Sequence, residues 1–391
     1  IYTGTGADLR INFGADSSFA GAKTPQGNQD ANSVGDFFYP VPSGFLALCT
    51  KSLPSVDVIP SEHFNTVLYT GNGSSTHAIT NVGFTPDWVW AKQRNTTRSH
   101  RLLDSVRGAG VYLASDNSNA ESSASGLFKT FDSDGFTLDA ANALNQSGGT
   151  YVAWNWKAGG SASSNTNGSI TSSVSANPAA GFSIVSYTGT QSNGATVGHG
   201  LTLAAPEMMI LKNRESNGGW HIYHTTLGAT KNVRFTTASA VTQSGVFNNT
   251  EPTASVVTLG TNSAINASGQ DIIAYCFHSV DGYSKVGSYT GNGSATDGTF
   301  VHCGFKPAWV MVKVTNVTDS WFINDNKRDS YNVVDEQLKA NSSDAEATNR
   351  GLDFVSNGFK IRDSSTSHNA SGNTYIFLAF AESPFKHSNA R

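Results

Sequence analysis

A chain of 391 residues can bury more than one core, because domains usually contain about 100 to 200 residues. Only 14% of the residues are charged and the formal net charge is -4, so the sequence lacks the basic footprint that nucleic-acid phosphates require. No apolar run approaches the roughly 20 residues of a membrane-spanning helix, which argues against membrane insertion. Abundant Gly, Ser, Thr and Asn favour many short strands joined by tight turns.

Residues 1–56 differ from the rest of the chain. The sequence begins at Ile1 inside a strand-like pattern, so we interpret it as the C-terminal part of a longer protein. INFGADSSFAG and GDFFYPVPSGFLALCT predict two strands separated by a long loop, with Pro40 and Pro42 confining the approach to the second strand to an edge or turn. A short link is expected at 57–63, in a stretch whose prolines favour extended backbone.

One signature then occurs three times, beginning with Tyr-Thr-Gly at residues 69, 187 and 289 and ending with Lys92, Lys212 and Lys313. A period of roughly 100 residues matches a whole β-sandwich domain rather than a solenoid unit. We therefore predict an all-β chain of tandem antiparallel β-sandwich (jelly-roll or concanavalin-like) domains, arranged as beads on a string. The predicted parts are repeat 1 at 64–160, a Gly/Ser/Asn-rich linker at 161–180, repeat 2 at 181–282 and repeat 3 at 283–391.

Within each repeat, two strands and one turn can be read directly. The run Asp87–Lys92 is apolar without alternation, which indicates a central strand covered on both faces. Asp134-Gly135 predicts the tip of a hairpin. The strand that closes each repeat places large apolar residues on one side, which we interpret as the sandwich core face. These residues are Val152, Trp154 and Trp156 in repeat 1, Ile273, Tyr275 and Phe277 in repeat 2, and Ile376, Leu378 and Phe380 in repeat 3.

The opposite side of the closing strand is mixed and often small. It carries Tyr151, Ala153 and Asn155 in repeat 1, and the sequence leaves open whether it packs under a loop, a neighbouring sheet or another subunit. Packing against another subunit would explain why the residues on this side are small. In that case Ala274→Trp in repeat 2 should harm assembly more than folding.

Metal chemistry finds little support. Asp132-Ser133-Asp134-Gly135 resembles the opening of a calcium loop, but the later acidic ligands are missing and repeat 3 has Val355 at the corresponding place. His221 and His224 fall on opposite faces of a strand. Cys49, Cys276 and Cys303 form no paired motif, so we expect buried free thiols, no metal site and no cofactor.

Catalytic chemistry is equally unsupported. His100, Asp104 and Arg107 lie close together in sequence, but no nucleophile accompanies them, so exposed structural pairs are the favoured interpretation. The lysine that ends the central strand of each copy is expected to carry its ammonium group back to water. We assign no catalytic residue.

A sugar-binding surface is harder to dismiss, because it needs only an exposed aromatic ring and a few polar groups on loops. Trp220 and Trp321 are the candidate rings, with Asp325 and Arg328 as polar partners. The alternative is that both rings belong to a core.

The runs FNTVLYTGNGS, GFTPDWVWAK, LLDSVRG, FDSDGFTL, TYVAWNWKAGG and IIAYCFHSVDGYSKVGSYTGNGS resemble the C-terminal repeat region of tail-fibre proteins from tailed bacteriophages, marine and cyanobacterial phages in particular. The resemblance covers residues 64 to 391. Residues 1–56, with INFGADSSFAG and PSGFLALCT, are similar to the end of a SPRY-like concanavalin-type domain.

The resemblance implies a virion structural protein on the particle surface that attaches to the host. It implies a homotrimer that contacts other virion proteins and binds a host glycan or receptor through loops, and it carries over no catalytic residue. Three alternatives remain open: a glycan-degrading tailspike enzyme, a head-decorating fibre and a cellular surface adhesin. The enzyme would need two facing carboxylates, for which Asp104, Glu121, Asp325 and Glu346 are candidates that no motif places.

Overall fold

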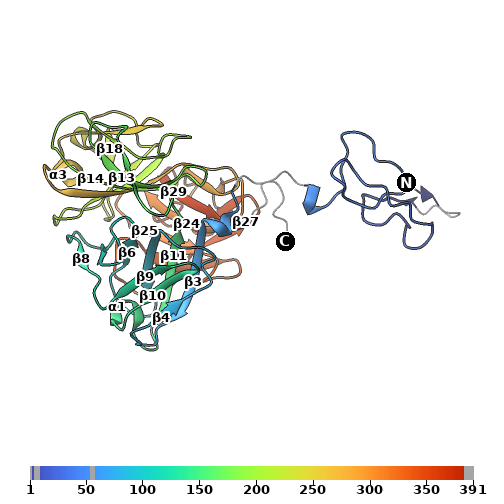
Figure 1. Ribbon diagram of the computed structural model, residues 1–391, viewed down its shortest axis with the longest axis horizontal. Helices are drawn as coiled ribbons and strands as arrows, with labels where there is room; N and C mark the ends of the chain where they lie inside the picture. Colours follow the sequence, from blue (N-terminus) through green and yellow to red (C-terminus); the bar gives the residue numbers. More distant parts are fainter. Residues whose placement is uncertain (1, 4–8, 53–57, 383–391) are drawn as a thin grey trace. The chain divides into compact units, whose positions relative to one another are not determined.

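The computed structural model describes residues 2–3, 9–52 and 58–382 (Figure 1). The protein is all-β, as the sequence predicts, and it divides into two compact units, Ile1–Ser55 and Val56–Arg391. None of the helices in the described ranges is long and apolar enough to cross a membrane.

The first unit consists mostly of turns and loops. The two strands expected in its INFGADSSFAG and GDFFYPVPSGFLALCT segments do not form, and residues 28 and 37 make only an isolated bridge. Side chains close the turns instead: the Asp30 carboxylate accepts hydrogen bonds from the amides of Val34 (3.0 Å) and Ala47 (2.8 Å). Its regular elements are β1 (Tyr2–Thr3), β2 (Leu9–Arg10) and the 3₁₀ turn η1 (Thr50–Ser52).

The second unit contains the three repeats, and each is built on the same four antiparallel strands with the closing strand second in order. The order is β3-β11-β5-β6 in repeat 1, β14-β21-β16-β17 in repeat 2 and β22-β29-β24-β25 in repeat 3. Their bounds are β3 (Phe64–Thr70), β5 (Trp88–Gln93), β6 (Arg101–Asp104), β11 (Thr150–Trp156), β14 (Phe182–Thr188), β16 (Met208–Asn213), β17 (His221–His224), β21 (Asp271–Phe277), β22 (Ser284–Thr290), β24 (Pro307–Val314), β25 (Trp321–Asp325) and β29 (Thr374–Ala381).

A second layer covers one face of each four-stranded sheet. In repeat 1 it is the sheet β4-β10-β9, in repeat 2 the pair β15-β20, and in repeat 3 the eight-stranded sheet continues through β26, β27, β28 and β23. The bounds are β4 (His77–Ile79), β9 (Phe128–Asp132), β10 (Gly135–Leu138), β15 (Ala195–Gly198), β20 (Val256–Leu259), β23 (Phe300–His302), β26 (Val334–Lys339), β27 (Ala347–Val355) and β28 (Gly358–Ile361).

Short elements complete repeats 1 and 2. They are β7 (Val111–Tyr112), β8 (Ser122–Ser123), α1 (Asn142–Asn145), β18 (Lys231–Asn232), β19 (Val241–Thr242), α2 (Ser244–Phe247) and α3 (Ser263–Asn266). The hairpin tip predicted at Asp134-Gly135 is confirmed, because Gly135 of β10 pairs with Asp132 of β9. The predicted central strand is confirmed too: every residue of β5 is buried.

The linker expected at 161–180 is wrong. Its residues form β12 (Ser163–Asn165) and β13 (Ser172–Asn177), which extend the main sheet of repeat 2 to six strands. β13 pairs with the outer edge of β14 from Ser172↔Tyr187 to Asn177↔Phe182. A Ser-rich composition suits a flexible linker, but here the unpaired edge of β14 provides a hydrogen-bonding partner for it.

The assignment of the two faces of the closing strand is also reversed. The sandwich core of repeat 1 contains Ala153 together with Val67, Val89 and Phe136, so the small face of β11 points inward. Ala274 and Cys276 lie likewise in the core of repeat 2, and Phe377 and Ala379 in that of repeat 3. Because Ala274 is buried within its own repeat, Ala274→Trp is expected to disturb folding itself.

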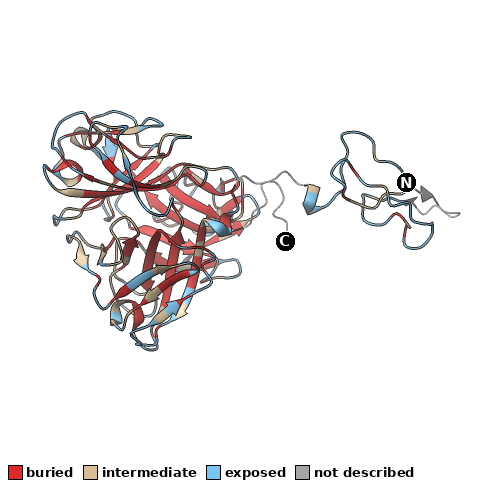
Figure 2. Cartoon of the chain, in the orientation of Figure 1, coloured by how far each residue is buried: buried red, intermediate tan, exposed pale blue. Residues whose placement is uncertain are grey.

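The large apolar face of each closing strand enters one core shared by all three repeats. This core contains Trp154, Trp156, Tyr275, Phe277 and Phe380, together with aromatic residues of the neighbouring strands. The main strands that meet there are buried (Figure 2). The arrangement as beads on a string is therefore wrong: the three repeats lie side by side and share a core (Figure 1).

Aromatic rings connect each pair of repeats. Trp88 of repeat 1 stacks on Tyr275 of repeat 2 with ring centroids 4.2 Å apart, and Phe64 of repeat 1 stacks on Phe380 of repeat 3 at 4.9 Å. Phe277 meets Phe380 edge to face at 6.1 Å, which joins repeats 2 and 3. Such pairs add to the free energy gained from the buried area alone.

Three of the expected segments reach beyond the described residues. Residues 1, 4–8 and 53–56 of the segment 1–56 lie outside them. Residue 57 of the link expected at 57–63 lies outside them, and the rest of that link contains the 3₁₀ turn η2 (Pro60–Glu62). Residues 383–391 of repeat 3 also lie outside the described part.

Candidate functional site: the junctions between repeats

The three repeats bind one another in a cycle. The amide of Glu121 in repeat 1 donates to the carbonyl of Arg214 in repeat 2 (2.6 Å), and the amide of Glu346 in repeat 3 donates to Arg94 in repeat 1 (2.8 Å). The corresponding amide of Ala240 in repeat 2 donates to Thr315 in repeat 3 (2.8 Å). One backbone hydrogen bond is thus repeated at three junctions, as in a ring of three subunits.

A second contact follows the same cycle. The ring nitrogen of Trp220 donates to the carbonyl of Ala114 (2.8 Å), and that of Trp321 donates to the carbonyl of Arg234 (2.7 Å). His100 occupies the equivalent place in repeat 1, and its Nε2 lies 3.0 Å from the carbonyl of Lys339. These residues begin or precede β6, β17 and β25, so the same strand in each repeat joins it to a neighbour.

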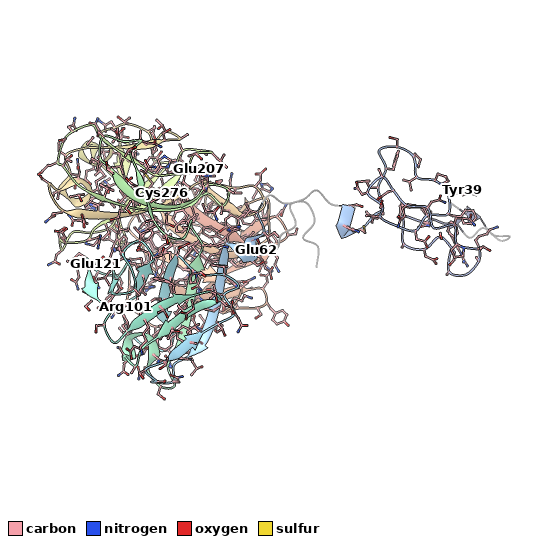
Figure 3. All side chains as sticks on the ribbon, viewed as in Figure 1. Tyr39, Glu62, Arg101, Glu121, Glu207 and Cys276 are labelled. Atoms are coloured by element: carbon pink, nitrogen blue, oxygen red, sulfur yellow. The ribbon has the colours of Figure 1, made fainter. Side chains whose placement is uncertain are left out.

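The junction between repeats 1 and 2 contains a buried ionic network. Arg107 pairs with Asp104 (2.5 Å) and Glu121 (3.0 Å), and the hydroxyl of Tyr275 from repeat 2 donates to Asp104 (2.8 Å). Arg214 of repeat 2 binds the other side of Glu121 (2.9 Å). Glu121 lies at the edge of repeat 1 that meets repeat 2 (Figure 3).

Burial disfavours the charged forms of Arg107 and Glu121, but their ion-pair partners favour these forms more strongly. Burial alone would lower the pKa of Arg107, whereas Asp104, Tyr275 and Glu121 raise it above its usual value. Burial also acts to raise the pKa of Glu121, but hydrogen bonds and charges from Arg214 and Arg107 lower it. Arg107 and Glu121 therefore pair as charged groups.

The junction between repeats 3 and 1 contains the equivalent network. Arg328 pairs with Asp325 (2.6 Å) and Glu346 (2.9 Å), and the indole of Trp154 from repeat 1 donates to Asp325 (3.0 Å). Arg94 of repeat 1 binds Glu346 (2.7 Å), as Arg214 binds Glu121. Burial opposes the charge of Arg328, but Asp325 and Glu346 raise its pKa.

The junction between repeats 2 and 3 has the same contacts but apolar chemistry. His224 and Leu227 stand where the other junctions have the Asp and Arg of the buried pair, and Leu378 stands where they have Tyr275 or Trp154. His224 Nδ1 accepts a hydrogen bond from the Thr226 amide (3.2 Å), and the backbone of Phe377 in repeat 3 also interacts with the buried ring. Burial lowers the pKa of His224 to about 4, so it is neutral near pH 7.

The three signature lysines are structural, but they do not return to water. Lys92, Lys212 and Lys313 are all buried, and burial lowers the pKa of each to about 8. Each ammonium group donates to backbone carbonyls; Lys212, for example, binds those of Asn213 (2.6 Å) at the end of its strand and Ser216 (2.8 Å) in the turn that follows. Lys313 also donates to the carbonyl of Thr237 in repeat 2 (3.1 Å). The expectation of a solvated head is wrong because these turns place carbonyl groups within its reach.

All four residues predicted to bind sugar are buried at the junctions. Trp220 is 1% exposed, Trp321 and Asp325 are 0% exposed, and Arg328 is 7% exposed. The expectation of an exposed ring is therefore wrong and the core interpretation holds. The structure does bring Asp325 and Arg328 together, as an ion pair. Sequence reasoning missed Arg94 and Arg214, which follow the signature lysine by two residues in repeats 1 and 2.

Other singled-out residues also have structural partners. Asp134 accepts hydrogen bonds from the amides of Asn81 (3.0 Å) and Gly83 (2.6 Å), which supports the turn interpretation. His100 and Asp104 are buried and the side chain of Arg107 is 0% exposed, so their interpretation as exposed pairs is wrong. Cys276 and Cys303 are buried free thiols as expected, whereas Cys49 is exposed. No group of three or more potential metal ligands occurs in the described ranges.

Open grooves occur on the surface of both units within the described residues. One, of about 280 Å³, lies in the first unit and is lined largely by aromatic and proline side chains, including Phe13, Tyr39 and Phe45. Another, of about 320 Å³, lies on repeat 2 and is lined mainly by hydroxyl groups of β12, β13 and β14.

The fold and the junctions define one β-rich domain made of three interlocked sandwich repeats. Residues 59–384 match the family described as "Domain of unknown function (DUF7483)", and the chain belongs to that family. The match spans all three repeats as one unit, in agreement with the shared core. No curated protein and no solved structure matches the chain.

Proposed function

We propose that this protein is a structural protein of a bacteriophage particle, a tail-fibre adhesin that attaches to the host surface through loops of its repeats. The supporting observation is that the carboxylates considered as candidate catalytic groups form ion pairs that join one repeat to the next. Asp104, Glu121, Asp325 and Glu346 each pair with an arginine. The domain thus uses its buried charges to hold a scaffold whose outer loops differ between copies.

The same observation disfavours a tailspike hydrolase. A glycosidase needs a carboxyl group that stays protonated near pH 7 as general acid. Arginine neighbours lower the pKa of Glu121, which is the opposite tuning. Asp104 and Asp325 are fully buried beside Arg107 and Arg328, where a saccharide cannot reach them.

On the basis of the resemblance, we also propose that the protein forms a homotrimer, that it lies on the virion surface and that it binds a host glycan or receptor. The internal ring of repeats already covers the large apolar strand faces that separate domains would expose. A trimer of this protein therefore has to use other surfaces, and light scattering of the purified protein measures its mass directly.

Gold-labelled antibodies against the protein, imaged on phage particles, test this function. Label on the tail tips, together with adsorption of the purified protein to the cells that those particles infect, supports the proposal. Label on the capsid supports the head-decorating fibre. Absence from the particles rejects a virion role and leaves the cellular adhesin.

A further inference from the structure

The groove of about 320 Å³ on repeat 2 has an ordered arrangement of hydroxyl groups. Ser164 of β12 pairs in register with Ser173 of β13, which in turn pairs with Ser186 of β14. Residues in register on neighbouring strands project from the same face, about 4.8 Å apart. The three serines therefore form a row across three strands.

A parallel row lies two residues further along the strands. Thr188 of β14 pairs in register with Asp271 of β21, and Thr171 immediately precedes β13 on the other side of Thr188. Thr188 donates to the Asp271 carboxylate (2.8 Å). Both rows line the groove, which therefore presents hydroxyl groups on one side and a carboxylate at one end.

Several of these polar groups are available to a ligand. Within the described ranges the hydroxyls of Ser164, Thr171 and Ser173 have no hydrogen-bond partner in the protein. The Asp271 side chain is 44% exposed. Hydroxyl groups both donate and accept hydrogen bonds, while the carboxylate only accepts them. A ligand rich in hydroxyl groups satisfies both kinds of partner.

The charge at the end of the groove disfavours an anion. Arg214 lies 3.5 Å from Asp271, but the same guanidinium is bound to Glu121 of repeat 1 at 2.9 Å. Arg107 also binds Glu121, so the network holds two arginines against the three carboxylates of Asp104, Glu121 and Asp271. No positive charge is left over for a phosphate, sulfate or sialic acid.

The groove depends on an element that the other main sheets lack. β12 and β13 extend the sheet of repeat 2 beyond β14, whereas no other named strand pairs with the outer edge of β3 or β22 in the described residues. At the place of Ser186, repeat 1 has Leu68 and repeat 3 has Ser288, both exposed. Among the described residues, the hydroxyl rows therefore occur only in repeat 2.

We propose that this groove binds a neutral saccharide, held by the hydroxyl rows and by the Asp271 carboxylate. The proposal rests on the adhesin function above and assigns its ligand contact to repeat 2. It also gives the Ser-rich segment 161–180 a function, since that segment supplies β12 and β13.

The test uses the full chain on an array of immobilised neutral and anionic oligosaccharides, with binding to host cells measured in parallel. Ser173→Trp fills the groove from an exposed strand position, and Ser288→Trp places the same bulk on the exposed edge strand of repeat 3 as a matched control. Asp271→Asn removes the charge with little change in shape. We expect wild type and Ser288→Trp to bind neutral saccharides equally, and Ser173→Trp and Asp271→Asn to lose roughly tenfold or more in affinity.

The outcomes separate this site from the general function. Equal saccharide binding by Ser173→Trp and wild type overturns the site, as does binding of anionic saccharides alone. If the wild-type chain adsorbs to host cells but binds no saccharide, the groove proposal fails and the adhesin stands. If it neither adsorbs nor binds, both fail. Asp271→Asn keeps the test decisive if Ser173→Trp does not fold.

Discussion

Two junctions of this domain are ionic and the third is apolar, although all three share one geometry. The same backbone hydrogen bond joins Glu121 to Arg214, Glu346 to Arg94 and Ala240 to Thr315. Arg107 and Arg328 form buried ion pairs at the first two junctions, while Leu227 occupies the equivalent place at the third. The comparison shows that the shared core and the backbone hydrogen bonds are common to all three junctions. The side chains between two repeats can then be either ion pairs or apolar residues.

This agrees with the general energetics of buried ion pairs. Replacing a whole buried network by apolar groups often leaves the free energy of unfolding unchanged. Removing one partner alone leaves an unpaired buried charge and lowers the free energy of unfolding by several kcal/mol. The three junctions of this domain allow the same comparison within one molecule. Two of them contain the complete ionic network, and the third has uncharged residues in place of the arginine and its partners.

The largest effect is expected from breaking one ionic junction. Arg328→Met leaves Asp325 and Glu346 buried with fewer partners and should lower the free energy of unfolding by about 3–5 kcal/mol. Leu227→Met at the equivalent apolar position is the control and should cost less than about 1.5 kcal/mol. Denaturant unfolding of both variants measures the difference, and equal losses would contradict the comparison.

Acid should act on the apolar junction through His224. Burial lowers the pKa of His224 from the usual 6.5 to about 4. Between these two pH values His224 is protonated in the unfolded chain but neutral in the folded one. Stability from this group is complete above pH 6.5, falls as the pH drops towards 4 and levels off below it, a loss of about 3 kcal/mol.

Burial also lowers the pKa of His100 and His221 to about 4, and it lowers the pKa of His63 and His199, so the wild type should show the sum of several such terms. His224→Leu removes one term, and its pH dependence between 6.5 and 4 should be shallower by one proton. Unfolding curves at pH 8, where these rings are neutral in both states, give the baseline. An unchanged slope in His224→Leu would show that the ring is protonated in the folded state.

Introducing one member of the network into the apolar junction should also destabilise it. Leu227→Arg places an unpaired guanidinium at a half-buried position and should cost about 1–3 kcal/mol. Adding His224→Asp and Ala240→Glu recreates the acidic partners found at the other junctions and should recover most of the loss. Additive losses in the triple variant, measured as a thermodynamic cycle, would show that the junctions are not equivalent.

An effect no larger than that of Leu227→Arg is expected at Lys212 of β16 in repeat 2. Lys212→Met removes the donor for the carbonyls of Asn213 and Ser216 and should cost about 1–3 kcal/mol. Lys92→Met removes the equivalent donor in repeat 1 and should behave alike, because the turn contact is independent of junction chemistry. A clearly larger effect in one repeat would tie the lysine to its junction.

Much of the local structure could be predicted from the sequence. Apolar runs give β5 with its buried faces, Asp134-Gly135 gives the hairpin of β9 and β10, and the three Tyr-Thr-Gly copies give three equivalent repeats. These signals are local, since strand period and turn geometry depend on a few neighbouring residues.

The candidate site was predicted only in part. Asp325 and Arg328 are three residues apart in a strand-to-turn segment, so their proximity was readable. Their partners Trp154, Glu346 and Arg94 come from distant positions in the chain, and no spacing rule connects them. Burial of the four sugar-binding candidates was likewise decided by contacts between repeats.

By itself, the sequence determined the all-β class, the three repeats and the strands that build them. Only the tertiary structure decided that the repeats share a core, that 161–180 pairs with β14, and that Trp154 faces another repeat while Ala153 faces its own sandwich. The physical reason is that both faces of β11 are buried, so alternation separates the two faces without saying what covers each one.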